Sequence, residues 1–170
     1  MSEFSHWNEE GRPKMVDISK KEETKRTAVA RCRVHFSEEL YEAIVQQQLK
    51  KGDPIQVAQI AGIMATKKTA DIIPMCHTIP IQGVDFTFQY EEAEEGYQLI
   101  IEATVSCKGN TGVEMEALTA VSAAALTFYD MCKAVDKAII IKETKLISKT
   151  GGKNGDFNLE KHEAAKKLNP

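Results

Sequence analysis

Alternation of apolar and polar side chains marks three segments of the chain, residues 28–36, 84–90 and 97–105. A period of two residues places the apolar side chains on one face of a β-strand, so each segment predicts a half-buried strand. The sequence EEAEEG separates the second and third segments and predicts the turn of a β-hairpin. The apolar segment AIIIKETKLI, residues 138–147, predicts a last strand.

Three helices are predicted between these strands. Ser37 is a typical N-cap for a first helix, which ends at KKGDP with Gly52 as its C-cap. A second helix is predicted over about 53–68, and its Ala, Ile, Val and Met content indicates burial on more than one side. A long helix is predicted over about 113–137, because this segment is rich in Ala and Leu and has no internal Gly or Pro.

The order of these elements is strand, helix pair, strand, strand, helix, strand. Two β-α-β halves joined by a hairpin are typical of a ferredoxin-like α+β sandwich. We therefore expect a four-stranded antiparallel sheet with helices packed on one face. Residues 24–158 are expected to form a single domain, between a flexible N-terminal segment (1–23) and a charged C-terminal tail that frays (159–170).

Composition and charge exclude several classes of protein. With 42% hydrophobic and 28% charged residues, the 170-residue chain is globular rather than disordered. Its net charge of −3 gives no general attraction to nucleic acids or anionic membranes, so an anionic ligand needs a local cluster of bases. No apolar run is long enough for a bilayer, and the polar N-terminal sequence does not resemble a signal peptide. The four cysteines form no C-x-x-C pair, which favours reduced thiols and a cytoplasmic location.

The segment PMCHTIPIQG, residues 74–83, places a cysteine beside a histidine. Adjacent side chains of an extended segment point in opposite directions, and zinc sites usually use C-x₂₋₄-C or H-x₃₋₅-H pairs. We therefore expect no metal here. The pattern by itself favours Cys76 as a small buried hydrophobe and His77 as a hydrogen-bonded core residue.

The long predicted helix carries charges at both ends. Glu114 and Glu116 lie in its first turn, where the helix dipole favours carboxylates, so capping alone explains them equally well. Asp130 and Lys133 are neighbours on one face near the other end, where an exposed ion pair contributes less than ~1 kcal/mol. The two ends are ~21 Å apart at about 1.5 Å per residue. A site on this helix therefore uses one end only, or combines ends from two subunits.

Lysines gather where the predicted elements break: Lys50 and Lys51, Lys67 and Lys68, and Lys149 and Lys153 in the glycine-rich tail. Lysines beside glycines combine mobile ammonium groups with exposed backbone N–H groups, which suits phosphate. Most lysine-rich loops are simply solvated, so this pattern alone is weak evidence.

Several motifs together resemble one enzyme family. These motifs follow one another along the chain in this order: MVDIS, KKGDP, AGIMATKKTADIIPMCH, PMCHTIPI, KGNTGVEMEALTAVSAAALTFYDMCKA and KTGGKNGDF. They are similar to cyclic pyranopterin monophosphate synthases, the C proteins of molybdenum cofactor biosynthesis. The resemblance covers about residues 11–157, nearly the whole predicted domain.

This resemblance implies a lyase that converts 3′,8-cyclo-7,8-dihydro-GTP to cyclic pyranopterin monophosphate and pyrophosphate. The step needs no redox change, in agreement with the lack of an iron–sulfur or dinucleotide motif. It requires general acid–base groups beside a purine-like ring and cations around a triphosphate. The resemblance implies no cofactor, apart from a Mg²⁺ ion that can accompany the triphosphate.

The resemblance also implies the residues of the site. Lys51, Asp130 and Lys133 match the family's catalytic residues, and we expect Asp130 to act as a general acid–base. Neighbouring cations can lower a lysine pKa toward neutrality, which would suit Lys133 for proton transfer. The expected substrate-binding residues are Met75, Cys76, His77, Glu114, Met115, Glu116, Lys67, Lys68 and Lys153.

The family is hexameric, a trimer of dimers, which implies a homo-oligomer that binds a small GTP-derived molecule. We expect the run AVSAAALTF to allow antiparallel packing of two long helices. Met75–His77 and Met115–Glu116 would then come from one chain and Asp130–Lys133 from another.

Two other classes of protein remain open. A ferredoxin-like sheet can bind RNA, but this needs solvent-facing aromatic and basic residues on the central strands, and the favoured strand phase buries Phe86 and Phe88. A small-molecule-binding regulatory module needs a pocket but no Asp–Lys pair. Retention on RNA would favour the first class, and nucleotide binding without turnover the second.

Overall fold

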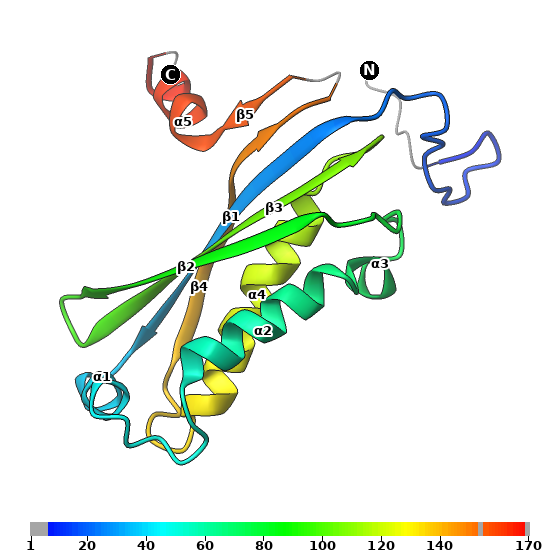
Figure 1. Ribbon diagram of the computed structural model, residues 1–170. Helices are drawn as coiled ribbons and strands as arrows, with labels where there is room; N and C mark the ends of the chain where they lie inside the picture. Colours follow the sequence, from blue (N-terminus) through cyan, green and yellow to red (C-terminus); the bar gives the residue numbers. More distant parts are fainter. Residues whose placement is uncertain (1–6, 153–154, 169–170) are drawn as a thin grey trace.

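A computed structural model describes residues 7–152 and 155–168 of the chain (Figure 1). The strands in this part are β1 (Thr24–Phe36), β2 (Gly83–Glu92), β3 (Tyr97–Gly109), β4 (Ile140–Thr150) and β5 (Phe157–Asn158). The helices are α1 (Glu38–Val45), α2 (Pro54–Thr66), α3 (Thr69–Ile72), α4 (Glu114–Cys132) and α5 (Leu159–Leu168).

The sheet is antiparallel and has the strand order β2-β3-β1-β4-β5. The central strand β1 pairs with β3 over its whole length, from Thr24 opposite Gly109 to Phe36 opposite Tyr97. The predicted ferredoxin-like α+β sandwich is confirmed, but the sheet has five strands instead of four. The additional strand β5 covers only two residues and pairs with the end of β4, so it is too short to leave a hydrophobic pattern.

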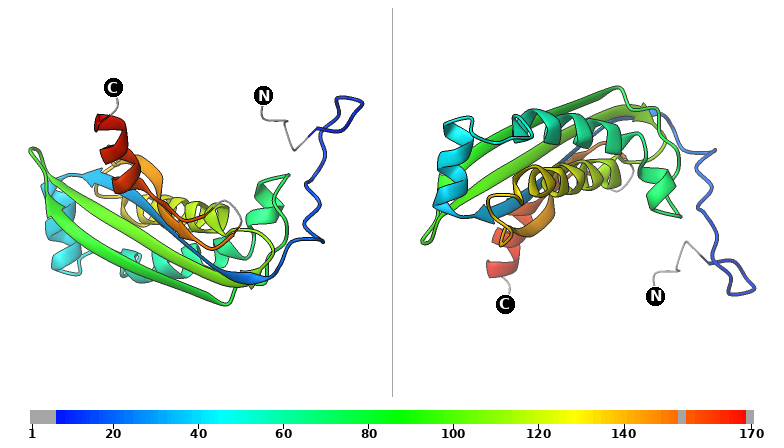
Figure 2. Two further views of the ribbon diagram at one scale, coloured as in Figure 1. Left: turned by 90° about the horizontal axis from the view of Figure 1, so that it is seen from above. Right: turned by 90° about the horizontal axis from the view of Figure 1, so that it is seen from below.

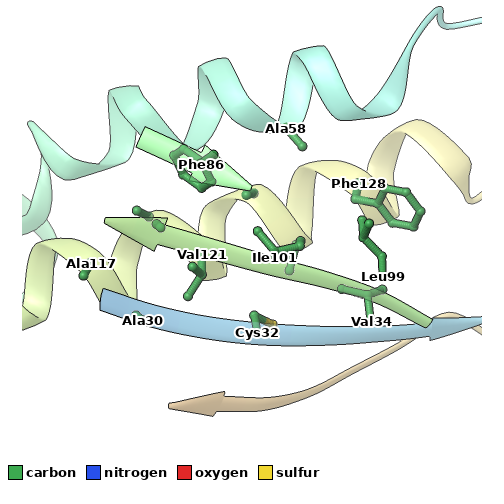
Figure 3. Packing of buried hydrophobic residues seen from close by; sticks show 14 of the residues in the cluster. Ala30, Cys32, Val34, Ala58, Phe86, Leu99, Ile101, Ala117, Val121 and Phe128 are labelled. Atoms are coloured by element: carbon green, nitrogen blue, oxygen red, sulfur yellow. The ribbon is translucent and has the colours of Figure 1, made fainter. Parts of the chain in front are cut away.

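The core lies between the sheet and two helices, α2 and α4, which run side by side on one face of the sheet (Figure 2). Every second side chain of β1 from Ala28 to Phe36 is buried, as the alternation predicted. Small residues of α4 face this surface, so the helix backbone approaches the sheet and α2 closely (Figure 3). Ala120, Ala124 and Ala125 of the AVSAAALTF run are therefore buried inside the chain, and not on a surface open to a second subunit.

α4 ends at Cys132, earlier than the predicted end near residue 137. The carboxylate of Asp136 accepts hydrogen bonds from the backbone N–H groups of Ser37 (2.9 Å) and Ala138 (2.8 Å). These bonds anchor the chain beside the end of β1 and direct it into β4. A side chain that binds two backbone N–H groups outside the helix favours a turn over further helix.

Residues 159–168 of the charged tail form α5, a helix that the sequence did not predict. The side-chain oxygen of Asn158 accepts a hydrogen bond from the backbone N–H of Lys161 at 3.1 Å, which is a typical N-cap. None of the helices in the described part of the chain is long and apolar enough to cross a membrane.

Gly62 lies where α2, α4 and β2 meet. A Cβ added at this position would lie 2.3 Å from Phe86 Cζ and 3.0 Å from the backbone carbonyl oxygen of Ala120. The close contact between the two long helices and the sheet therefore depends on the missing side chain of Gly62.

We expect Gly62→Ala to lower the free energy of unfolding by about 1–3 kcal/mol, because overpacking outweighs the ~1 kcal/mol gain in helix propensity. Urea denaturation measures the change. Adding Phe86→Leu to the same variant should restore part of the loss, since it makes room for the new methyl group. A Gly62→Ala protein as stable as the original would contradict this account of the packing.

Candidate active site

The N-terminal end of α4 faces a cavity of about 540 Å³. Three segments that are distant in sequence surround this cavity: residues 16–21, residues 73–79 and the start of α4. The residues in its wall are Val16, Ile18, Lys21, Ile73, Met75, Cys76, His77, Ile79, Thr111, Gly112, Glu114, Met115 and Glu116. The fold therefore brings the predicted binding segments 75–77 and 114–116 together.

Glu116 is a buried carboxylate in this wall, only 2% exposed. Burial raises the pKa of its carboxyl group, and the neighbouring Glu114 carboxylate adds to the increase. Burial and the charge of Glu116 also raise the pKa of the Cys76 thiol, which is therefore protonated at neutral pH. Cys76 thus contributes shape and a weak hydrogen-bond donor rather than a reactive thiolate.

His77 connects the cavity to the N-terminal segment. Its Nε2 lies 2.8 Å from the backbone carbonyl oxygen of Val16. Because a carbonyl oxygen can only accept, the neutral imidazole carries its proton on Nε2 and leaves Nδ1 as an acceptor. His77 can therefore hold the N-terminal segment and still accept a hydrogen bond at Nδ1.

A second cavity, of about 480 Å³, adjoins the first. The two share Lys21, Thr111, Gly112 and Glu114 in their walls. The other residues of the second wall are Glu22, Thr24, Arg26, Asn110, Lys149, Thr150, Gly151 and Gly152. Lys149 Nζ lies 2.8 Å from Glu114 Oε1, so an ion pair stands where the cavities meet.

Arg26 is the most unusual residue of the second cavity, because its cationic side chain is only 8% exposed. Its Nε donates a hydrogen bond to the backbone carbonyl oxygen of Gly109 at 3.2 Å. In residues 7–152 and 155–168 it forms no salt bridge. Gly152 has a φ of +100°, which favours glycine, and a Cβ at this position would lie 2.1 Å from Arg26 Nη1 and displace the guanidinium. A buried guanidinium without a carboxylate partner is suited to bind an anion.

The opposite end of α4 carries a compact charged cluster. Asp130 Oδ1 accepts a hydrogen bond from Lys133 Nζ at 2.7 Å, and Asp130 Oδ2 accepts one from Lys51 Nζ at 2.8 Å. Lys51 Nζ also donates to the backbone carbonyl oxygen of Asp130 at 2.7 Å, near the C-terminal end of the helix. The three residues that match catalytic positions therefore meet within one chain.

These ion pairs determine the protonation states of the cluster. The hydrogen bonds and charges of Lys133 and Lys51 lower the pKa of Asp130 to about 2. The hydrogen bond to Asp130 raises the pKa of Lys133, which is the opposite of the lowering expected from the sequence. At neutral pH the single chain thus holds a carboxylate between two ammonium groups.

Other predicted residues lie apart from both cavities. The charged cluster is ~21 Å from Glu116 along α4, so the two ends of the helix do not converge in one chain. Lys67 and Lys68 are exposed and line neither cavity, and Lys68 pairs with Asp71 at 3.3 Å. Lys153 lies outside the described residues.

Among the wall residues that the sequence did not predict are three with polar side chains that the proposals below use, Lys21, Arg26 and Asn110. Arg26 carried a recognisable signal, since it continues the alternation of β1 into Ala28 and is therefore a charged residue in a core position. Lys21 and Asn110 carried no such signal, because irregular segments bring them to the site.

The described part of the chain contains no group of three or more His, Cys, Asp or Glu side chains that could hold a metal ion. All four cysteines are free. Cys32, Cys107 and Cys132 are buried in the core, and Cys76 lines the first cavity.

The sequence is similar to those of several known proteins. Two curated relatives named cyclic pyranopterin monophosphate synthase, from Shouchella clausii and Lysinibacillus sphaericus, are each 69% identical over 157 residues. These alignments cover 92% of this chain and 95% and 98% of the two relatives. A relative of the same name from Geobacillus thermodenitrificans is 58% identical over 92% of this chain and 97% of its own. The MoaC family model matches residues 15–152, and the chain therefore belongs to the MoaC family.

Proposed function

We propose that this protein is a cyclic pyranopterin monophosphate synthase, a phosphorus–oxygen lyase that acts in molybdenum cofactor biosynthesis. Its substrate is 3′,8-cyclo-7,8-dihydro-GTP, and its products are cyclic pyranopterin monophosphate and pyrophosphate. One structural observation carries the proposal beyond family membership. The cavity that contains His77 and buried Glu116 adjoins a second cavity lined by cations, which suits a polar ring linked to phosphates.

The purine-derived ring occupies the first cavity in this proposal. A volume of about 540 Å³ lies in the range of small-molecule sites, roughly 300–1,000 Å³. Glu116 faces the amino and amide N–H groups of the ring, because a carboxylate accepts two parallel hydrogen bonds. Met75 and Met115 supply adaptable apolar contacts to the ring faces.

The phosphates occupy the second cavity, where Lys21, Arg26 and Lys149 supply positive charge. This assignment differs from the sequence-based one, which placed the triphosphate at Lys67, Lys68 and Lys153. In a single chain Lys67 and Lys68 line neither cavity, so they would reach a phosphate only at a site shared with another subunit. Closure of the cyclic phosphate breaks the bond between the α-phosphorus and the pyrophosphate oxygen, and nearby cations stabilise the negative charge on the leaving group.

In this proposal the charged cluster of Lys51, Asp130 and Lys133 at the other end of α4 transfers the protons. With a pKa of about 2, Asp130 is ionised at neutral pH, so in the single chain it holds no proton to donate at the start of the reaction. We therefore assign the general acid to the ammonium groups of Lys51 and Lys133, with Asp130 as the carboxylate that aligns them.

We propose that each active site is built from two subunits, with the two cavities from one chain and the Lys51, Asp130 and Lys133 cluster from the other. Apolar side chains are exposed on the outer faces of the two long helices: Val57, Ile60 and Met64 on α2, and Leu126 on α4, which is 64% exposed. A stripe of this kind is typical of a surface that contacts another protein. A second copy that packs here in antiparallel orientation would place its Asp130 cluster near the first copy's cavity. We propose a homohexamer built as a trimer of dimers.

The remaining features of the proposal follow from the reaction. The protein works in the cytoplasm on a small molecule, without a nucleic acid or membrane partner. It needs no redox cofactor, because the step involves no electron transfer, and we propose that it has no other resident cofactor. A magnesium ion, where present, enters with the triphosphate.

Purified protein incubated with 3′,8-cyclo-7,8-dihydro-GTP should release pyrophosphate and the cyclic pyranopterin. Lys51→Ala and Lys133→Ala should each lower kcat at least ~10²-fold with an unchanged fold, because each removes a proton donor. Lys161→Ala, which removes an exposed lysine of α5, is the matched control. Nucleotide binding without turnover by the unmodified protein would instead indicate a regulatory module.

Arg26→Ala should raise KM at least ~10-fold, because the phosphates lose a buried bidentate partner. Arg26→Lys should recover part of the affinity, since it keeps the charge but not the planar guanidinium. Arg12→Ala is the control, because Arg12 is exposed and pairs with Glu10 away from both cavities. A KM that Arg26→Ala leaves unchanged at low and high salt would remove this cavity from the phosphate site.

His77→Ala and Lys133→Ala proteins, each inactive alone, should regain partial activity when mixed under conditions of subunit exchange. A mixed dimer then contains one site with both groups intact. Activity of a monomer at high dilution, or no recovery despite mass-spectrometric proof of mixed oligomers, would show that the site is not shared.

A further inference from the structure

Residues 16–21 cross the wall of the first cavity and are held there by two side chains of the domain. His77 Nε2 donates to the carbonyl oxygen of Val16 at 2.8 Å. Asn110 Nδ2 donates to two further carbonyl oxygens, those of Ile18 at 3.2 Å and Lys21 at 2.9 Å. We call residues 16–21 the N-terminal strap. Figure 1 shows this part of the chain as the blue segment that leads into β1.

The strap has its own internal structure. Asp17 Oδ1 accepts a hydrogen bond from the backbone N–H of Ser19 at 2.8 Å, and the backbone N–H of Lys21 donates to the carbonyl oxygen of Ile18 at 3.1 Å. Such local bonds are typical of a turn that moves as one unit. Its attachment to the domain through His77 and Asn110 therefore positions the whole turn.

The side chains of the strap contribute directly to both cavities. Val16, Ile18 and Lys21 line the first cavity, and Lys21 also lines the second. The cation of Lys21 thus belongs to the region that joins the proposed ring and phosphate sites. Displacement of the strap would remove one wall of the first cavity and one of the cations of the second.

Asn110 is suited to hold the strap at this place. It follows the last residue of β3, Gly109, and precedes Thr111 and Gly112, which line both cavities. Its amide group offers two N–H donors, and both observed partners are carbonyl oxygens, which fixes the orientation of the amide. The rigid end of β3 is thereby linked to the backbone of Lys21 itself.

We propose that Asn110 is a positioning residue that holds the N-terminal strap against the domain and so places Lys21 between the two cavities. This inference rests on the proposed function, because it assigns Lys21 to the bound nucleotide derivative. Asn110 itself need not touch the substrate. Asn110 increases the fraction of molecules in which the strap is in place. The apparent affinity for the substrate decreases in proportion when that fraction decreases.

Asn110→Ala should raise KM about tenfold and change kcat less than about twofold, because the strap spends most of its time displaced. Asn110→Asp should behave like Asn110→Ala, since a carboxylate cannot donate to two carbonyl oxygens. Asn8→Ala is the matched control: Asn8 Oδ1 accepts from the backbone N–H groups of Glu10 and Arg12, in the same N-terminal region but away from the cavities. Its KM should stay unchanged.

A double-mutant cycle separates this role from a general loss of stability. If Asn110 acts by placing Lys21, Asn110→Ala should raise KM clearly less, at most about threefold, in a Lys21→Ala background, where only the wall formed by Val16 and Ile18 is still lost. The same tenfold change in both backgrounds would overturn the proposal, because the effect would then be independent of Lys21.

Limited trypsin digestion tests the strap without reference to turnover. Cleavage after Lys20 and Lys21 should be at least several-fold faster in Asn110→Ala than in the unmodified protein or Asn8→Ala, at an unchanged Tm. Equal cleavage rates would show that Asn110 does not hold the strap. Faster cleavage in a protein that never turns over the nucleotide derivative would support the strap attachment and contradict the proposed function instead.

Discussion

Burial of α4 against the sheet and α2 fixes the positions of both charged clusters. The helix presents small side chains to the core, and Gly62 lets α2 approach it without a Cβ in between. Sliding or bending the helix would open cavities or force atoms into contact, and both cost free energy in a closely packed core. The distance of ~21 Å between Glu116 and Asp130 is therefore fixed within one chain. A reaction that needs groups from both ends of α4 therefore requires two chains in one site.

The two ends of α4 differ in how water reaches their carboxylates. Glu116 is shielded from water, so burial raises the pKa of its carboxyl group. Asp130 is exposed and accepts hydrogen bonds from two ammonium groups, which lower its pKa to about 2. Carboxyl groups whose pKa values are moved in opposite directions can take different roles in one reaction. In the proposed reaction Glu116 would recognise the polar ring, and Asp130 would align the two lysines.

A chain with a net charge of −3 nevertheless has an excess of cations around one cavity, whose wall contains three basic residues and two carboxylates. β1 contributes Arg26, β4 contributes Lys149 and the N-terminal strap contributes Lys21. Because Arg26 is buried and Lys149 is held by Glu114, these groups lose little conformational freedom when an anion binds. The net charge of the chain therefore does not indicate whether its ligand is an anion, whereas the local arrangement of charges around the cavity does.

The sequence by itself determined the class of the fold and most of its elements. Alternation in β1, the hairpin of β2 and β3, and the Ala-rich α4 follow from local periodicity, which depends only on neighbouring residues. Motifs also indicated the segments 75–77 and 114–116, and the structure places both in one cavity wall. Only the tertiary structure decided that Lys51 meets Asp130, that Arg26 is buried without a carboxylate partner among the described residues, and that Asn110 holds the strap. These contacts join residues far apart in the chain. Lys51 and Asn110 lie in irregular segments that carry no period in the sequence, and whether a carboxylate faces Arg26 depends on distant residues that pack around it.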